Sequence, residues 1–172
     1  MFESNDTFVE DAVKSKPTGS QGAIRIASLV ITIILAIATL MGVFLPFSAV
    51  LCIIFIVITF IIMGNKNIEF EYDYTNGSLE IAKIINNEKR KKIVSVESAE
   101  IRQIAAIGTN ESLKYDNVKM KIYDCSAHDE NVKDYILVAH NEEKNYDFKV
   151  LFSPSEKLIN AMKKYNKRDI YE

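Results

Sequence analysis

The strongest constraint on this chain is an apolar block that carries no charge. From Ile26 to Asn65 the sequence contains no Asp, Glu, Lys, Arg or His. As a single helix the block would be about 60 Å long, whereas the hydrocarbon core of a bilayer is about 30 Å thick. Gly42 and Pro46 interrupt it near the middle, and Pro46 has no N–H to continue a helix. The block therefore predicts a transmembrane helical hairpin over residues 23–65, with helices at about 23–44 and 47–64.

A cleaved signal peptide is the competing interpretation of this block. The block is too long for one signal-peptide apolar region, and the stretch before it carries acidic residues. These are Glu3, Asp6, Glu10 and Asp11. The hairpin is therefore the preferred interpretation.

Lysine and arginine residues predict the orientation of the hairpin. Lys14, Lys16 and Arg25 precede the apolar block, Lys66 follows it, and the loop between the predicted helices is uncharged. We therefore expect a multi-pass protein of the cell membrane with both termini on the cytoplasmic side. An ion pump needs ionisable groups at membrane depth, and the block contains none.

Small residues recur on one side of the first predicted helix. Ser28, Thr32 and Ala36 are spaced every four residues, which places them on one face. Small side chains let a second helix approach closely. We expect this face to pack against the second helix of the hairpin.

Residues 1–22 are expected to form an amphipathic segment followed by a linker. Thr7 and Glu10 have the spacing of a capping box, which predicts a short helix. One side of that helix would carry Phe8, Val9, Ala12 and Val13, and residues 16–22 have the composition of a linker. We expect the helix to dock on the protein's own polar domain or on a partner; the alternative is a frayed tail without a function.

Residues 66–172 form the polar remainder, and their first part alternates with period two. The whole chain has 21 Lys and Arg against 23 Asp and Glu, which argues against bulk electrostatic binding of nucleic acid. Asn76-Gly77 lies between two alternating runs, and this pair predicts a two-residue β-hairpin. That turn would place Tyr72 opposite Ile81 and Tyr74 opposite Leu79.

The rest of the polar region predicts short strands and a terminal helix. Ser153-Pro154-Ser155-Glu156 marks a helix start, with Ser153 as the cap and Pro154 in the first turn. Its buried stripe would contain Leu158, Ile159, Met162 and Tyr165. With the first β-hairpin the strands number seven; the other five lie at 91–96, 99–105, 118–125, 135–140 and 146–152.

Short motifs distributed along most of the chain carry a resemblance to known proteins. They are Phe8–Glu10, Lys16–Gly19, Glu71–Gly77, Lys83–Ile85, Lys89–Lys92, Pro154–Glu156 and Lys164–Asn166. The order of elements resembles the pleckstrin-homology (PH) superfold, and the whole arrangement resembles an uncharacterised family of small Firmicutes membrane proteins. The resemblance implies an α+β membrane protein: a transmembrane helical hairpin, then a PH-like, seven-strand, partly open β-barrel capped by a C-terminal α-helix. It implies no catalytic residue.

The densest cluster of positive charge is Lys89, Arg90, Lys91 and Lys92. A domain tethered below a bilayer holds such a cluster within reach of headgroups, where each basic residue adds about 1 kcal/mol. We identify these residues as candidate contacts for anionic lipid or a partner. The alternative is a solvated turn that only enforces the inside orientation.

Possible metal ligands and a nucleophile gather between Asp124 and Glu130. Cys125 and His128 lie there, and His140 follows. A structural zinc site needs four ligands at defined spacing, and a Cys–His pair needs a base held near the thiol and an oxyanion site. The sequence shows neither arrangement. We therefore expect a polar loop and assign no catalytic, cofactor-binding or metal-binding residues.

These observations favour a non-enzymatic, membrane-anchored scaffold or binding module. It would present the PH-like domain at the cytoplasmic membrane face, without a cofactor, to a protein partner or anionic headgroups. The alternative is an accessory subunit of a larger membrane transport or secretion complex.

Overall fold

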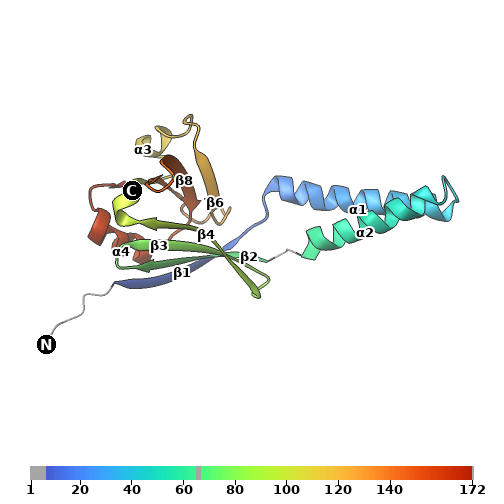
Figure 1. Ribbon diagram of the computed structural model, residues 1–172, viewed down its shortest axis with the longest axis horizontal. Coiled ribbons are helices and arrows are strands. Elements are labelled where there is room, and N and C mark those ends of the chain that lie inside the picture. The colour runs from blue at the N-terminus through green and yellow to red at the C-terminus, as the bar shows by residue number, and fades with distance from the viewer. Residues whose placement is uncertain (1–6, 65–66, 172) are drawn as a thin grey trace. The chain divides into compact units, whose positions relative to one another are not determined.

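The computed structural model describes residues 7–64 and 67–171. The chain divides into two compact units. The first is the helical segment 17–66, and the second joins the chain up to Lys16 to the chain from Asn67 onward. The helical segment is thus inserted into the second unit (Figure 1).

The helical unit contains α1 (Gly19–Leu40) and α2 (Phe47–Gly64). Both helices are long and apolar enough to cross a membrane. The predicted helical hairpin is therefore present, but α1 begins and ends four residues earlier than predicted. Gly42 and Phe44 have φ of 71° and 52°, and this left-handed backbone cannot continue a right-handed helix.

The small-residue face of α1 packs against α2, as expected. The Thr32 hydroxyl donates to the Ser28 carbonyl at 2.8 Å and lies 2.9 Å from the Thr59 hydroxyl of α2. Ser28 and Thr59 are buried. These contacts satisfy the hydroxyl groups of Thr32 and Thr59 within an otherwise apolar pair of helices.

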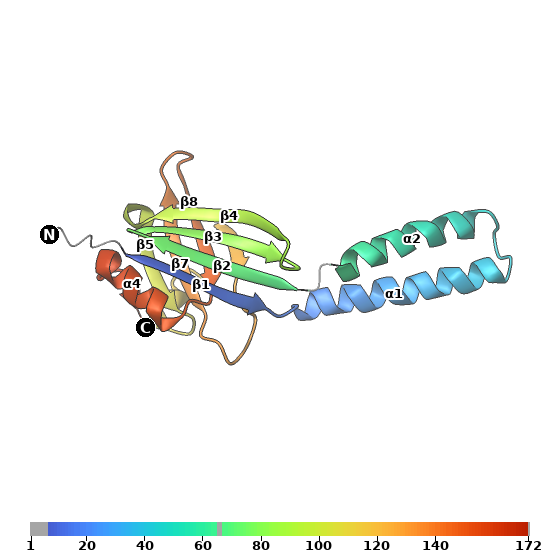
Figure 2. The same ribbon diagram turned by 90° about the horizontal axis from the view of Figure 1, so that it is seen from below.

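The second unit begins with a four-stranded antiparallel sheet in the order β1-β2-β3-β4 (Figure 2). Asn76 and Gly77 form the β2–β3 turn with φ of 49° and 96°, as the Asn-Gly pair predicted. Tyr72 lies opposite Ile81 and Tyr74 opposite Leu79, which confirms the predicted register. The strands are β1 (Phe8–Ser15), β2 (Ile68–Thr75), β3 (Ser78–Ile85) and β4 (Lys89–Glu97).

The prediction of an N-terminal helix is wrong, because Phe8–Ser15 is the strand β1. It pairs with β2 along its whole length, from Phe8 opposite Thr75 to Ser15 opposite Ile68. Val9 points into the core, whereas Phe8 is 62% exposed. Val9 and Val13 are four residues apart, a spacing that puts two side chains on one face of either a helix or a strand. The periodicity therefore could not distinguish the two structures.

The other strands form a five-stranded sheet in the order β6-β8-β7-β5-β9. All seven predicted strands are present, and β1 and β9 are additional. Among the described residues the two sheets are not joined by strand pairing, so the prediction of a partly open barrel is not confirmed. The strands are β5 (Ile101–Ala106), β6 (Lys121–Cys125), β7 (Tyr135–Asn141), β8 (Tyr146–Phe152) and β9 (Ile170–Tyr171), with short helices η1 (Ser98–Glu100) and α3 (Asn110–Leu113).

The predicted terminal helix is α4 (Glu156–Asn166). Its N-cap is Ser155, whose side chain accepts from the Leu158 N–H, and not Ser153. Tyr165 is 43% exposed and packs edge-on against Tyr74, with 6.0 Å between ring centroids. The other three residues of the predicted stripe are buried.

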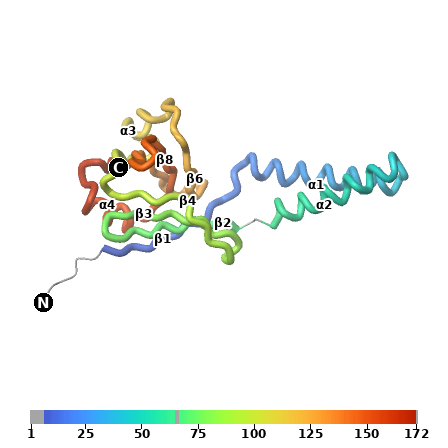
Figure 3. Tube along the Cα trace, viewed as in Figure 1, coloured from blue at the N-terminus to red at the C-terminus, as the bar shows by residue number. Residues whose placement is uncertain are grey.

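The second unit, whose backbone path is traced in Figure 3, contains one large hydrophobic core and a smaller cluster of Ala105, Ile136 and Val138. The large core draws side chains from both sheets and from α4. Fully buried members include Tyr72, Leu79, Ile104, Leu137, Val150, Phe152, Leu158 and Met162.

Substitutions at the neighbouring residues Val9 and Phe8 test the assignment of β1. Val9→Ser should lower the free energy of unfolding by about 1.5 to 3 kcal/mol, because it exchanges a buried apolar side chain for a hydroxyl. Phe8→Ser should cost less than about 0.5 kcal/mol, because Phe8 is mostly in solvent. Denaturation of the full chain in detergent, followed by near-ultraviolet circular dichroism of the tyrosines, measures both. Equal losses would contradict the strand.

Candidate functional site

A buried polar network joins the two sheets at Tyr72. The Tyr72 hydroxyl donates to the Cys125 carbonyl at 2.7 Å and accepts from the Ser153 N–H at 3.1 Å. The Ser153 hydroxyl accepts from the Ala127 N–H at 2.7 Å and donates to the Asp134 carboxylate. The residues around Cys125 therefore hold the fold together through their backbone groups.

The Cys125 side chain is poorly placed for nucleophilic chemistry. It is fully buried, and burial, together with the neighbouring Asp124 carboxylate, raises its thiol pKa to about 12. A thiolate is the reactive form of cysteine, so this thiol stays protonated at neutral pH. Sequence reasoning could not show the burial.

The two histidines lie in separate hydrogen-bonding groups. His128 contacts Asp124 at 3.4 Å and the Ser126 hydroxyl at 3.4 Å. His140 lies opposite Asp147 in the β7–β8 pair, with 2.7 Å between Nδ1 and Oδ1. Within the described part of the chain, neither histidine joins Cys125 in a close group of metal-ligand atoms.

Strand alternation divides the basic run Lys89–Lys92 between the two sides of the four-stranded sheet. Arg90 and Lys92 lie on the outer side. Arg90 contacts Glu71 at 2.5 Å, Asp73 at 2.8 Å and Glu80 at 3.2 Å, and Lys92 contacts Glu80 at 2.7 Å.

Lys89 and Lys91 lie on the opposite side of β4. Lys91 is paired with Lys83 of β3, which is paired in turn with the buried Phe70 of β2. Among the described residues no salt bridge involves Lys83, Lys89 or Lys91. Within the predicted cluster, Arg90 and Lys92 therefore form salt bridges on the sheet, whereas Lys89 and Lys91 form none with described residues.

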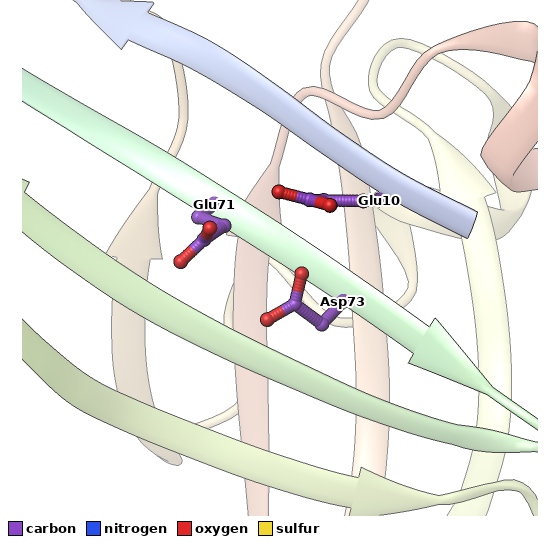
Figure 4. A group of neighbouring side chains, drawn as sticks. All are labelled: Glu10, Glu71 and Asp73. Carbon is purple, nitrogen blue, oxygen red and sulfur yellow. The ribbon is translucent and has the colours of Figure 1, made fainter. Parts of the chain in front are cut away.

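The outer face of the sheet also carries an acidic cluster that sequence analysis did not identify. Carboxylate oxygens of Glu10, Glu71 and Asp73 lie within 4.8 Å of one another (Figure 4). Glu71 and Asp73 are two residues apart on β2 and therefore share one face of the sheet. Glu10 joins them because β1 is a strand that pairs Glu10 with Asp73. Carboxylates can bind divalent cations; here Arg90 already contacts two of the three.

Charge and burial shift the carboxyl groups of this face in opposite directions. Partial burial and the nearby Glu71 carboxylate raise the pKa of Asp73, and Arg90 only partly offsets them. The hydrogen bond from Lys92, supported by Arg90, lowers the pKa of Glu80. The face is therefore an ion-pair network whose negative charges depend on Arg90.

An open groove of about 800 Å³ lies where the loop before β6 and the start of that edge strand meet Tyr146, Asp147 and Lys149 of β8. Its apolar lining includes Val118 and Ile122, which are 42% and 53% exposed. Lys121 belongs to the same lining and holds its ammonium 4.6 Å from the centre of the Tyr123 ring. An exposed strand edge with nearby apolar side chains can pair with an extended peptide.

Two sheets, a C-terminal helix and an inserted apolar hairpin define a PH-like domain with a candidate membrane anchor. The chain belongs to the bacterial PH-like domain family DUF6106, whose family model matches residues 5–172. The predicted resemblance is thereby confirmed at the level of a bacterial PH-like domain. No curated protein and no solved structure shows detectable similarity.

Tyrosine-to-phenylalanine substitutions test the polar network. Tyr72→Phe should lower the free energy of unfolding by about 1 to 3 kcal/mol, because it leaves the Ser153 N–H and the Cys125 carbonyl without their buried partner. The control is Tyr74→Phe: the buried Tyr74 hydroxyl has no hydrogen-bond partner in the described structure, so its loss should be neutral or stabilising. Denaturation of the full chain compares the two, and equal costs would contradict the network.

The pH dependence of Arg90→Gln tests the outer ion-pair network. Without Arg90 the folded-state pKa of Asp73 should rise further above its unfolded-state pKa. At pH values between these two pKa values the folded protein binds more protons than the unfolded chain. The free energy of unfolding therefore falls as the pH rises through this range. We expect Arg90→Gln to match wild type at acidic pH and to lose stability progressively towards neutral pH.

Lys91→Gln is the matched control for Arg90→Gln, because it removes one charge from the neighbouring position on the other side of β4. It should show no such pH-dependent loss. Thermal unfolding across the acidic to neutral range measures both variants. A deficit of Arg90→Gln that is the same at every pH would show that the carboxylates do not depend on Arg90.

Proposed function

We propose that this protein is a membrane-anchored, non-enzymatic scaffold that presents its PH-like domain to a partner at the cytoplasmic face of the cell membrane. The observation that carries the proposal is the insertion of a membrane-capable hairpin between two paired strands of the domain. Such a connection attaches both ends of the hairpin to the folded domain.

Strand pairing supports a common side for the two ends of the hairpin. Ser15 is the last residue of β1 and lies opposite Ile68, the first residue of β2. Because these strands flank the hairpin, a hairpin that crosses a membrane must return to the side on which it started. The lysine and arginine distribution supports a cytoplasmic location for this side.

The state of the chemically reactive groups supports a binding role. The Cys125 thiol is buried with a raised pKa, and Arg90 contacts two of the clustered carboxylates. Among the described residues β6 pairs only with β8, which leaves its other edge open, and Ile122 of β6 is exposed. An extended segment of a protein partner fits such an edge through backbone hydrogen bonds.

The alternative function is an accessory subunit of a larger membrane transport or secretion complex. Both helices expose broad apolar faces, as Ile34 and Ile53 illustrate with 59% and 63% exposure. Such faces suit lipid, but they also suit lateral contact with the helices of another membrane protein.

Site-specific photo-crosslinking in native membranes distinguishes the two functions. A photoreactive residue at Ile122 should capture a stoichiometric soluble protein, whereas one at Ile53 should capture only lipid. A probe at Val96, which is 1% exposed, is the control and should capture neither. Capture of one stoichiometric integral membrane protein from Ile53, with nothing from Ile122, would replace the scaffold by the subunit.

A further inference from the structure

We propose that the end of the four-stranded sheet at which the chain enters and leaves the hairpin contacts anionic lipid headgroups through Lys83, Lys89 and Lys91. In this division of roles, Arg90 and Lys92 stabilise the sheet and do not touch lipid. The inference rests on the proposed function in one respect: the hairpin must be inserted in a membrane.

Chain connectivity limits how far this end of the sheet can be from the ends of the helices. Residues 16–18 connect β1 to α1, and residues 65–67 connect α2 to β2. Each connection spans at most about 14 Å when fully extended. Any arrangement of the two units must satisfy both limits together, because Ser15 and Ile68 are paired.

Strand register places the three lysines at this same end. Ser15 is paired with Ile68, Ile68 with Ile85, and Ile85 with Lys89, so these four residues form one row across the sheet. Lys91 and Lys83 are two residues further along their strands, about 7 Å from that row. The whole set therefore lies within two residues of the row from which the hairpin continues.

Among the described residues no salt bridge neutralises this set of lysines, which leaves their charges available to an anion from outside the domain. Lys83 and Lys91 are directly opposite each other, and like charges in that arrangement destabilise a sheet. Glu88 is the acidic residue of the adjoining β3–β4 turn, and the structure records no salt bridge between it and the three lysines. By contrast, Arg90 and Lys92 are each paired with carboxylates on the outer face.

A lipid surface is the anion that fits this placement. The hairpin would keep headgroups at high local concentration beside the lysines. The attraction acts over about 10 Å at moderate salt, comparable with the reach of the connections. Each lysine near an anionic surface strengthens contact about 5-fold, so the three together should shift the ratio of docked to undocked domain about 100-fold.

The test uses the full chain in vesicles with a fluorophore at Glu88→Cys, since both native cysteines are buried. Vesicles contain phosphatidylcholine with or without phosphatidylglycerol, and a headgroup quencher reports contact with the surface. The test variant is Lys83→Gln with Lys89→Gln and Lys91→Gln. The charge-matched control is Lys114→Gln with Lys119→Gln and Lys157→Gln, three exposed lysines elsewhere on the domain.

We expect quenching to require phosphatidylglycerol, to disappear at high salt, to be lost in the test variant and to persist in the control. Near-ultraviolet circular dichroism verifies that both variants are folded. Equal quenching with and without phosphatidylglycerol, or equal loss in test and control variants, would overturn the lipid contact. Flotation of wild type after an alkaline wash reports insertion separately: failure there contradicts the anchored scaffold, whereas normal flotation without lysine-dependent quenching contradicts only this inference.

Discussion

The pairing of β1 with β2 is the constraint on which the architecture depends. It joins two segments that flank the hairpin, and it is continuous from Phe8 to Ser15. Closing a long connection costs chain entropy, and two helices that pack on each other shorten the effective connection between the paired strands. The domain can therefore complete its first sheet only when both sides of the hairpin are together. Folding of the hairpin and folding of the domain are therefore coupled, although the two are separate compact units.

Once β1 is in place, polar contacts tie it to the rest of the domain. Asp11 accepts a hydrogen bond from the Ser155 N–H at the start of α4, at 2.6 Å. The Lys16 N–H donates to the Ala127 carbonyl at 2.8 Å, in the loop that Ser153 also holds. The segment between Asp124 and Glu130 thus has a structural role through its backbone groups. It connects the first strand to the second sheet, and its cysteine contributes a carbonyl to Tyr72.

Local signals predicted most of the fold, and long-range partners account for what they did not predict. The Asn76-Gly77 turn determined the β2–β3 register because turn geometry and the apolar alternation agree. β1 was mistaken for a helix because Val9 and Val13 fit both periods, and the two residues of β9 are too few to show any period. The basic cluster could be located from the sequence, but the division of its four residues between the two faces of the sheet could not. The partners of Arg90 depend on the register of three strands and on the irregularity at Ile81 and Ala82.

That irregularity gives the basic run its two roles. In a regular antiparallel pair, residues on opposite strands alternate together. The register shift between Ile81 and Ala82 brings Lys92 and Arg90 to the side where Glu80 and Glu71 lie, and leaves Lys91 opposite Lys83. Beyond the shift, the charges of Arg90 and Lys92 on one side of β4 are therefore neutralised by carboxylates of the sheet. The positive charge on the other side of β4 is not neutralised in this way. A run of four cations thus stabilises the sheet on one face, whereas Lys89 and Lys91 on the other face form no salt bridge with any described residue, at the end where the chain enters the hairpin.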